Sequence, residues 1–239
     1  EIKEYLVDFQ KKELPKLIER DIKIKDSKKI KSLIGPRRVG KTFLMFQKIN
    51  ELLKQKNEKQ NILYLNLEDP RLIEINFKEI KEIVKLQWRL YPRSKKEFYV
   101  FIDEPQNIKN WEIAIRAMHD EGFNIFLSGS SSKLLSKEIA TSLRGRTISY
   151  TILPFTFKEF LKIKSLRFDP ARLSSEEKSK LLSLIDEYLE FGSFPEVILE
   201  QDVENKIKIL KEYLDLIVYR DIVERYKIKN TQLIRWLIK

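Results

Sequence analysis

A phosphate-binding pattern lies near the start of the chain, in the segment GPRRVGKT. Its spacing is G-x-x-x-x-G-K-[ST], and the two glycines free the backbone so that its amide groups can point at phosphate oxygens. Lys41 would bring a solvent-facing positive charge to the β and γ phosphates, and the Thr42 hydroxyl would coordinate Mg²⁺. The pattern predicts a nucleotide site, with a solvated basic turn as the alternative. The residues it assigns to the ligand are Gly35, Pro36, Arg37, Arg38, Val39, Gly40, Lys41 and Thr42.

Two carboxylates end a second apolar segment, FYVFIDEP, which runs from Phe98 to Pro105. A buried parallel strand that ends in Asp103 and Glu104 would place both at the crevice where open α/β sheets bind ligands. Asp103 would hold Mg²⁺ through water, and Glu104 would polarise the attacking water as general base. The alternative is an ordinary loop with two acids. The phosphate pattern and the acidic pair support each other, since both belong to one kind of site.

A serine-rich segment follows the next apolar run, which ends at Leu127. The run is Ser128-Gly129-Ser130-Ser131-Ser132, and a hydroxyl at that strand end could contact the γ phosphate. Ser131 or Ser132 could equally well cap the start of a helix, because serine is a preferred helix N-cap. Both interpretations stay open at this point.

Arg144 and Arg146 flank a glycine in the segment Thr141 to Leu161. Two guanidinium groups held by a turn could reach a transferred phosphate, in the same subunit or in a neighbouring one. Taken by itself, this feature also fits a solvated basic turn.

The order of the elements predicts how these residues are brought together. Apolar strands alternate with amphipathic helices up to Pro154, which predicts an α/β fold with a parallel sheet flanked by helices. The strands are expected at 30–34, 61–67, 98–103, 123–127 and 148–152, and the helices at 43–56, 72–90 and 111–120.

After Pro154 only helices are expected, at 155–163, from a capping box at Ser174 and Glu177 to Phe191, and at 203–226. We therefore expect a P-loop core at 1–154 and an α-helical lid at 155–226. An apolar pattern begins at 227–239 and does not finish, which suggests the start of a further, truncated domain.

Composition excludes several other classes of site. The 239 residues include no cysteine and one histidine, so thiolate chemistry, disulfides and His-rich metal sites are excluded. His119 is interpreted as structural. The net charge of +11 is concentrated in residues 1–60, with 17 basic against 9 acidic side chains, and in 121–180, with 11 against 6. This excess fits a polyphosphate site and also permits nucleic acid.

Nothing in the chain indicates a membrane segment or a signal peptide, so a soluble, cytoplasmic protein is expected. The chain begins with Glu1 instead of Met, and it is expected to be a trimmed fragment.

Five segments in order resemble one known family, the prokaryotic and mainly archaeal AAA-like P-loop ATPases related to the STAND group. They are GPRRVGKT, VFIDEPQNIKNWE, FLSGSSSKLL, LRGRTISYTILPFTFKEF and FGSFPEV. The resemblance covers about residues 15 to 225, and it implies a parallel-sheet ATPase core followed by a helical lid, with ATP and Mg²⁺ as cofactors. Longer members of the family add a winged helix and often a restriction-endonuclease-like domain.

The resemblance also implies roles for particular residues. Lys41 and Thr42 match the first Walker motif, and Asp103 and Glu104 match the second. Ser128 or Ser130 would be the sensor, Arg144 or Arg146 the arginine finger, and Gly192 to Pro195 the lid motif, with Pro195 against the nucleotide. The pair Arg20-Asp21, before the first strand, resembles the segment that borders the adenine, so Arg20 is expected at the nucleotide. Pro105 departs from the Ile or Val that usually follows the acidic pair.

Three functions are compatible with the sequence. The leading hypothesis is an ATP-binding and ATP-hydrolysing module that changes conformation with its nucleotide. A slow nucleotide-gated interaction switch is the second, and the ATPase module of a DNA-processing protein is the third. Glu104 favours hydrolysis, because a protein that only binds nucleotide needs no water-polarising carboxylate. Self-association, and DNA or protein partners acting through missing C-terminal domains, are compatible with each hypothesis.

Overall fold

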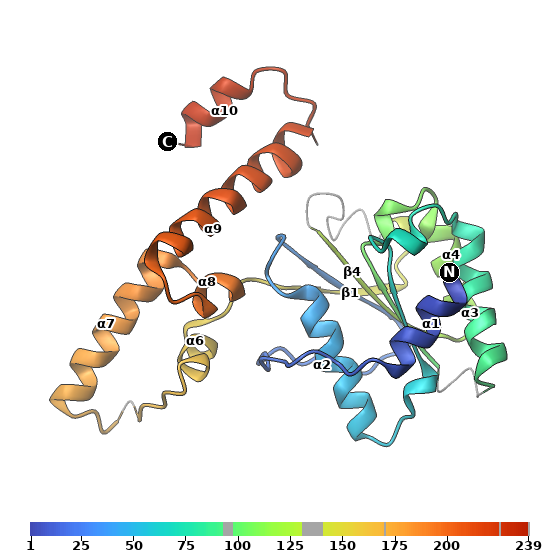
Figure 1. Ribbon diagram of the computed structural model, residues 1–239, viewed down its shortest axis with the longest axis horizontal. Helices are drawn as coiled ribbons and strands as arrows, with labels where there is room; N and C mark the ends of the chain where they lie inside the picture. Colours follow the sequence, from blue (N-terminus) through green and yellow to red (C-terminus); the bar gives the residue numbers. More distant parts are fainter. Residues whose placement is uncertain (93–97, 131–140, 170, 225, 239) are drawn as a thin grey trace. The chain divides into compact units, whose positions relative to one another are not determined.

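The computed structural model describes residues 1–92, 98–130, 141–169, 171–224 and 226–238 (Figure 1). They form two compact units. The sheet unit contains Glu1–Gly35 and Lys41–Ile152, and the helical unit contains Pro36–Gly40 and Leu153–Lys239. The middle of the predicted phosphate loop therefore groups with the helical unit, while its first glycine and its Lys-Thr pair group with the sheet unit.

A five-stranded sheet forms the centre of the sheet unit, with the order β2-β3-β4-β1-β5. All four strand pairings are parallel, as predicted. Because parallel strands all end at the same edge, the predicted phosphate loop after β1 and the acidic pair after β3 lie at one edge of the sheet, with the end of β4 between them. The strands are β1 (Ile30–Gly35), β2 (Ile62–Asn66), β3 (Tyr99–Asp103), β4 (Asn124–Ser130) and β5 (Thr147–Thr151).

Helices cover both faces of this sheet, with α2 on one side and α3 and α4 on the other (Figure 1). Side chains alternate along each strand, so Val100 and Ile102 join the core beneath α1, α3 and α4, while Phe101 faces the α2 side. The helices are α1 (Ile2–Lys11), α2 (Lys41–Lys54), α3 (Phe77–Leu90) and α4 (Trp111–Asp120). Short 3₁₀ turns are η1 (Lys59–Asn61), η2 (Pro70–Leu72) and η4 (Pro105–Asn107).

Two helices of the sheet unit differ from the sequence prediction. The helix expected at 72–90 begins at Phe77, because Asn76 and Glu79 form a capping box that fixes its start. Helix α1 was not predicted. It buries Tyr5 and Leu6 in the core of the sheet unit, and Gln10 donates a hydrogen bond to the carbonyl of Ile62 in β2.

The helical unit contains no strand among its described residues. Its capping box at Ser174 and Glu177 is confirmed, with both reciprocal hydrogen bonds present. The helix expected at 203–226 changes character after Leu216, where the backbone continues as a wider π-helical segment. The elements are α6 (Phe157–Ile163), α7 (Ser175–Phe191), α8 (Pro195–Leu199), α9 (Val203–Leu216), η5 (Ile217–Glu224) and α10 (Thr231–Ile238).

Aromatic rings and ion pairs hold the helical unit together. Tyr188 of α7 packs edge-on against Phe157 and Phe160 of α6, with ring centroids 5.3 and 5.5 Å away. Glu187 accepts hydrogen bonds from Lys164 and Lys206, both at 2.9 Å, which joins α7 to α9. None of the described helices in either unit is both long and apolar enough to cross a membrane.

Candidate functional site

The connection from β1 to α2 is tightly constrained at its first glycine. A Cβ on Gly35 would lie 2.0 Å from the carbonyl oxygen of Ile152, so no other residue fits there without moving the backbone. Lys41 begins α2, and its Nζ donates a hydrogen bond to the Gly35 carbonyl at 3.1 Å. The prediction that Lys41 faces solvent is wrong, since the side chain folds back over the loop and the residue is only 7% exposed. Its ammonium group and the positive end of the α2 dipole lie at the loop that is expected to receive phosphate.

The Asp103 carboxylate is the centre of a buried polar cluster at the strand ends. Thr42 Oγ1 donates to Asp103 Oδ2 at 2.6 Å, and the Tyr64 hydroxyl donates to the same oxygen at 3.2 Å. Ser128 donates its hydroxyl to the other oxygen, Oδ1. The strand register explains the cluster, because Asp103 pairs with Ser128 of β4 on one side and with Asn66 of β2 on the other. Three hydroxyl donors thus hold one carboxylate that is 4% exposed.

The Tyr64 hydroxyl can act only as a proton donor toward this carboxylate. Burial raises the pKa of Tyr64 well above its usual range, and the charge of Asp103 raises the pKa further. Burial likewise raises the pKa of the neighbouring Tyr5 to about 12. Both phenols therefore stay protonated at neutral pH.

Glu104 leaves the strand in an unusual backbone conformation. Its φ of 53° and ψ of 51° lie in the left-handed region, which is rare for a residue with a side chain and is often found at functional sites. Its amide donates to the carbonyl of Ser128 at 2.8 Å, so β4 still holds the backbone at this point. Pro105 starts the turn η4, and Gln106 donates its side-chain amide to the Glu104 carboxylate. Pro105, which replaces the usual Ile or Val after the acidic pair, therefore does not displace Asp103 and Glu104 from the end of β3.

The middle of the loop and the predicted lid motif both belong to the helical unit. Arg38 has a positive φ of 64°, and its guanidinium carbon lies 5.9 Å from the ring centroid of Tyr213 in α9. Gly40 has a φ of 88°, and a Cβ placed there would lie 3.8 Å from Cγ of Pro195. The structure thus brings Pro195 of the lid motif beside the loop residue Gly40.

Arg20 lies against α2, whereas Ser130 lies at the end of β4. Arg20 is buried, and its backbone exchanges two hydrogen bonds with the Gln47 side chain of α2, at 2.8 and 3.1 Å. Ser130 ends β4 in register with Gly35. Ser131 and Ser132, the proposed helix caps, lie outside the described residues.

The two arginines lie at the opposite edge of the sheet from the phosphate loop. Arg146 immediately precedes β5, and its carbonyl accepts a hydrogen bond from the Ile30 amide at the start of β1. Gly35 lies five residues further along β1, which corresponds to about 17 Å of extended strand. Arg146 also forms a two-pronged ion pair with Asp120, at 3.0 and 3.3 Å, while Arg144 is exposed with a positive φ of 51°. The structure therefore does not bring either arginine to the loop of its own chain.

The oxygen atoms of Thr42 and Asp103 fit the magnesium role expected from the sequence. Magnesium prefers hard oxygen ligands and keeps several waters, so it is bound by one or two protein oxygens together with substrate phosphates. Among the described residues, no group of three or more His, Cys, Asp or Glu side chains could hold a metal ion by itself. This donor set fits a metal ion that arrives with a nucleotide.

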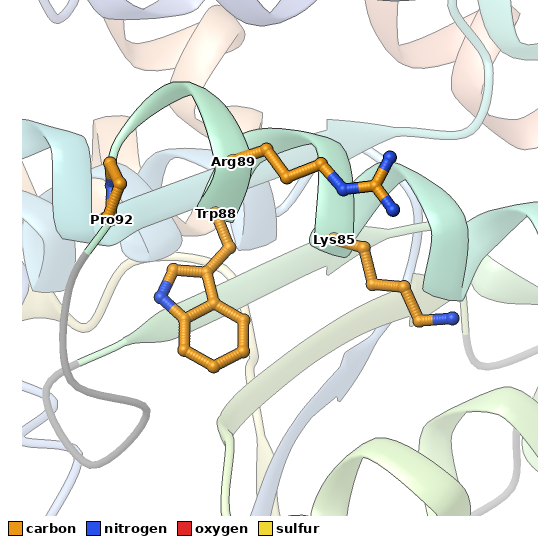
Figure 2. Close-up of a pocket in the computed structure, with 4 residues that line it drawn as sticks. All are labelled: Lys85, Trp88, Arg89 and Pro92. Carbon is orange, nitrogen blue, oxygen red and sulfur yellow. The ribbon is translucent and has the colours of Figure 1, made fainter.

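A separate hollow of about 550 Å³ lies at the end of α3, lined by Lys85, Trp88, Arg89 and Pro92. Figure 2 shows the Trp88 ring and the two cationic side chains extending from the same helix. Residues 93–97, which follow Pro92, lie outside the described part of the chain. The hollow contains none of the residues predicted to bind the nucleotide.

Sequence reasoning did not find two side chains that contact the acidic pair. Tyr64 looked like an ordinary strand residue, and the signal that could have found it is its position two residues before the register partner of Asp103. Gln106 lies two residues after Glu104, which is close enough in sequence to have suggested a contact.

Comparison with known proteins agrees with the fold. A family described as AAA domain matches residues 27–161, which is more than half of the chain. The chain belongs to this AAA-domain family. The matched region contains the β1–α2 loop, the acidic pair and both arginines, and it begins after α1. The AAA-domain fold is a P-loop NTPase fold, and here it is followed by a helical region.

Relatives of this AAA-domain protein include two that are described only as uncharacterized. One from Methanocaldococcus jannaschii is 48% identical over 93% of this chain, and one from Haemophilus influenzae is 34% identical over 91%. The chain spans about half the length of these curated relatives, 48% and 52% respectively. Among solved structures, Cdc6p from Pyrobaculum aerophilum aligns with a TM-score of 0.37 and 18% identity, over 56% of this chain and 41% of that one.

Proposed function

We propose that this chain is an ATP-binding and ATP-hydrolysing module that uses Mg-ATP to drive a conformational change. The observation that carries the proposal is the cluster in which Thr42 and Ser128 donate to the buried Asp103 carboxylate. Lys41 begins the adjoining helix with its ammonium group at the loop. A hydroxyl and a carboxylate at this spacing supply the oxygen ligands that the magnesium of a bound nucleotide requires.

Each residue has a distinct role in the proposal. The loop from Gly35 to Thr42 binds the phosphates, and Arg20 and Pro195 border the nucleotide. Asp103 and Thr42 hold the magnesium, which would supply charge neutralisation at the phosphates when bound. Glu104 accepts a proton from the attacking water, and its partly exposed carboxylate at the strand end supports that role. Ser128 is proposed as the sensor, acting through its hydrogen bond to Asp103.

Arg144 is the better candidate for an arginine finger, and it would act on a neighbouring copy of the chain. Two observations support this assignment. It lies at the sheet edge opposite its own loop, and its side chain is exposed, whereas Arg146 is engaged by Asp120. Self-association is therefore part of the proposal.

A slow nucleotide-gated switch is the second candidate function. The contact from Gln106 to Glu104 favours it in one respect, because a carboxylate engaged by an amide is held away from a free role as base. A DNA-processing role, and the winged-helix and endonuclease-like domains of the resembling family, would require the remainder of a longer protein. Turnover measured with and without duplex DNA across a salt series separates these candidates.

The direct test compares Lys41→Met with Lys48→Met. Both lysines are buried on α2, but Lys48 donates to the Ile24 carbonyl and to Asp26, away from the loop. We expect Lys41→Met to weaken ATP binding by about 10²-fold or more, because charge-assisted contacts to phosphate are lost, and Lys48→Met to bind normally. Binding is measured calorimetrically on proteins whose folding is checked by circular dichroism. Unchanged affinity in a folded Lys41→Met protein would refute the nucleotide site.

A further inference from the structure

Tyr64 is a buried tyrosine that the roles assigned above do not use. It lies on β2 with 8% of its surface exposed, on the same face of the sheet as α2. Its hydroxyl donates to Asp103 Oδ2 at 3.2 Å, the oxygen that also accepts from Thr42 at 2.6 Å. Asp103 Oδ2 thus accepts two hydrogen bonds, one from Thr42 at the start of α2 and one from Tyr64 on the neighbouring strand β2.

Aromatic packing fixes where this hydroxyl lies. The Tyr64 ring has its centroid 5.0 Å from that of Phe46 in α2 and 5.7 Å from that of Phe9 in α1. Phe46 lies one turn after Thr42 on the same helix. The ring therefore links the helix that begins at the phosphate loop with the strand beside Asp103, and Phe9 of α1 also packs against it.

Polar contacts also fix α1 against the rest of the sheet unit. The Tyr5 hydroxyl accepts a hydrogen bond from the Asn66 amide at 2.9 Å, and Arg71 joins Asp8 at 2.8 Å. The guanidinium of Arg71 also lies 4.8 Å from the Tyr5 ring centroid. Tyr64 thus packs against side chains of two helices, α1 and α2, and a side chain supported in this way can fix the orientation of its hydrogen-bond partner.

The consequence for Asp103 is geometric. A carboxylate can rotate about its last side-chain bond, and this torsion is broad in the absence of neighbours. With Ser128 on Oδ1 and both Thr42 and Tyr64 on Oδ2, rotation would break hydrogen bonds at both oxygens. Partners that orient metal ligands in this way commonly affect metal affinity by 10- to 100-fold.

We propose that Tyr64 is a positioning residue that orients Asp103 for the magnesium ion bound with the nucleotide. The inference rests on the proposed function, because it assigns to one residue of this chain the task of fixing that site. It predicts that the Tyr64 hydroxyl contributes to magnesium-dependent nucleotide binding and not to nucleotide binding as such.

The test compares Tyr64→Phe with Tyr5→Phe, since each variant loses one buried hydroxyl within the same unit. ADP binding is measured by calorimetry in EDTA and across a magnesium series, and thermal unfolding is followed for each protein. For Tyr64→Phe we expect unchanged ADP affinity in EDTA and an increase of about tenfold in the magnesium concentration for half-maximal effect. Tyr5→Phe should keep the wild-type magnesium dependence, because its hydroxyl contacts the Asn66 amide and not Asp103.

Two results would overturn the inference. One is a wild-type magnesium dependence in folded Tyr64→Phe protein. The other is an equal shift in both variants, which would indicate a general loosening of the unit. Failure of the proposed function looks different, because the wild-type protein itself would then show no magnesium-dependent binding of ADP or ATP.

Discussion

The sheet unit and the helical unit bury their side chains to very different extents. Leu33, Val100 and Phe101 on the strands are fully buried, and the helices on both faces contribute further buried side chains. In contrast, none of the 17 residues of α7 is fully buried, and Leu189 at its end is 74% exposed. The helical unit relies instead on ring contacts and on ion pairs around Glu187.

This difference indicates where fixed geometry is available for chemistry. Close packing on both faces holds the ends of β3 and β4, so the Asp103 cluster has rigid support. The helical unit has fewer buried apolar contacts, and elements of this kind open at lower free energy. We therefore expect catalytic side chains to act from the sheet unit, while the helical unit changes its packing with the nucleotide.

The largest expected effect comes from Arg144, which belongs to the sheet unit but is exposed on its surface. If it serves a neighbouring copy, Arg144→Ala should lower ATP turnover by about 10³- to 10⁵-fold, with little change in stability. Arg146→Ala is the control, because Arg146 is already paired with Asp120. Turnover per chain is measured over a range of protein concentrations.

A mixing experiment completes this prediction. Arg144→Ala protein mixed with Glu104→Gln protein should regain activity, since each copy supplies the group that the other lacks. Wild-type turnover by Arg144→Ala would show that this arginine is only a surface residue.

Glu104→Gln should have the next largest effect. The substitution keeps the shape of the side chain and removes the base, so turnover is expected to fall by about 10²- to 10⁴-fold while ATP affinity is retained. Asn107→Ala, an exposed change on the same turn, serves as the control. Phosphate release and equilibrium binding are measured in parallel. Turnover near the wild-type rate would mean that the Glu104 carboxylate has a structural role. That result would favour the hypothesis of a slow nucleotide-gated switch.

A third prediction compares the two units through one type of substitution. Phe101→Ala removes a fully buried ring stacked on Phe126, with centroids 4.5 Å apart, and should cost about 3–5 kcal/mol of unfolding free energy. Phe157→Ala removes a half-buried ring from the helical unit and should cost about half as much. Hydrogen exchange read separately over each unit measures both costs. Equal losses would contradict the difference in packing.

The smallest effect concerns the pH dependence of the helical unit. Burial by itself would raise the pKa of Glu187, but hydrogen bonds from Lys164 and Lys206 outweigh it and hold the pKa below its usual value. The folded-state pKa is thus depressed, so the stabilisation is present above about pH 4.5 and is lost as pH falls through the folded-state value.

Glu187→Gln should therefore reduce the acid sensitivity of the helical unit, by about 1 kcal/mol or less between neutral and acidic pH. Glu204→Gln is the matched control, because its pair with Lys208 is exposed and 3.9 Å long. Unfolding is followed by circular dichroism from pH 7 to pH 3. An identical acid response in the Glu187→Gln and wild-type proteins would show that this ion pair contributes nothing.

Local patterns were sufficient to predict the parallel sheet and the strands and helix that position the candidate site, because these depend on short-range sequence signals. Strand alternation and the G-x-x-x-x-G-K-[ST] spacing depend on neighbours within a few residues. The capping box at Ser174 is local in the same way.

What the sequence could not provide depends on pairing between distant segments. The contact of Tyr64 with Asp103 spans 39 positions and requires the order of the strands. The buried position of Lys41 depends on its fold back to Gly35, and helix α1 is stabilised by tertiary packing on the sheet unit. The width of the helical turn after Leu216 likewise has no strong local signal.

The two glycines of the phosphate loop differ in what a mutation would reveal. At Gly35 the β5 chain end occupies the space that any side chain would need, whereas Gly40 is limited by its φ of 88° and has Pro195 at ordinary contact distance. A substitution at Gly35 would force the backbone around Ile152, which follows β5, to shift. A side chain at the first glycine therefore meets a steric barrier, whereas a side chain at the second meets backbone strain.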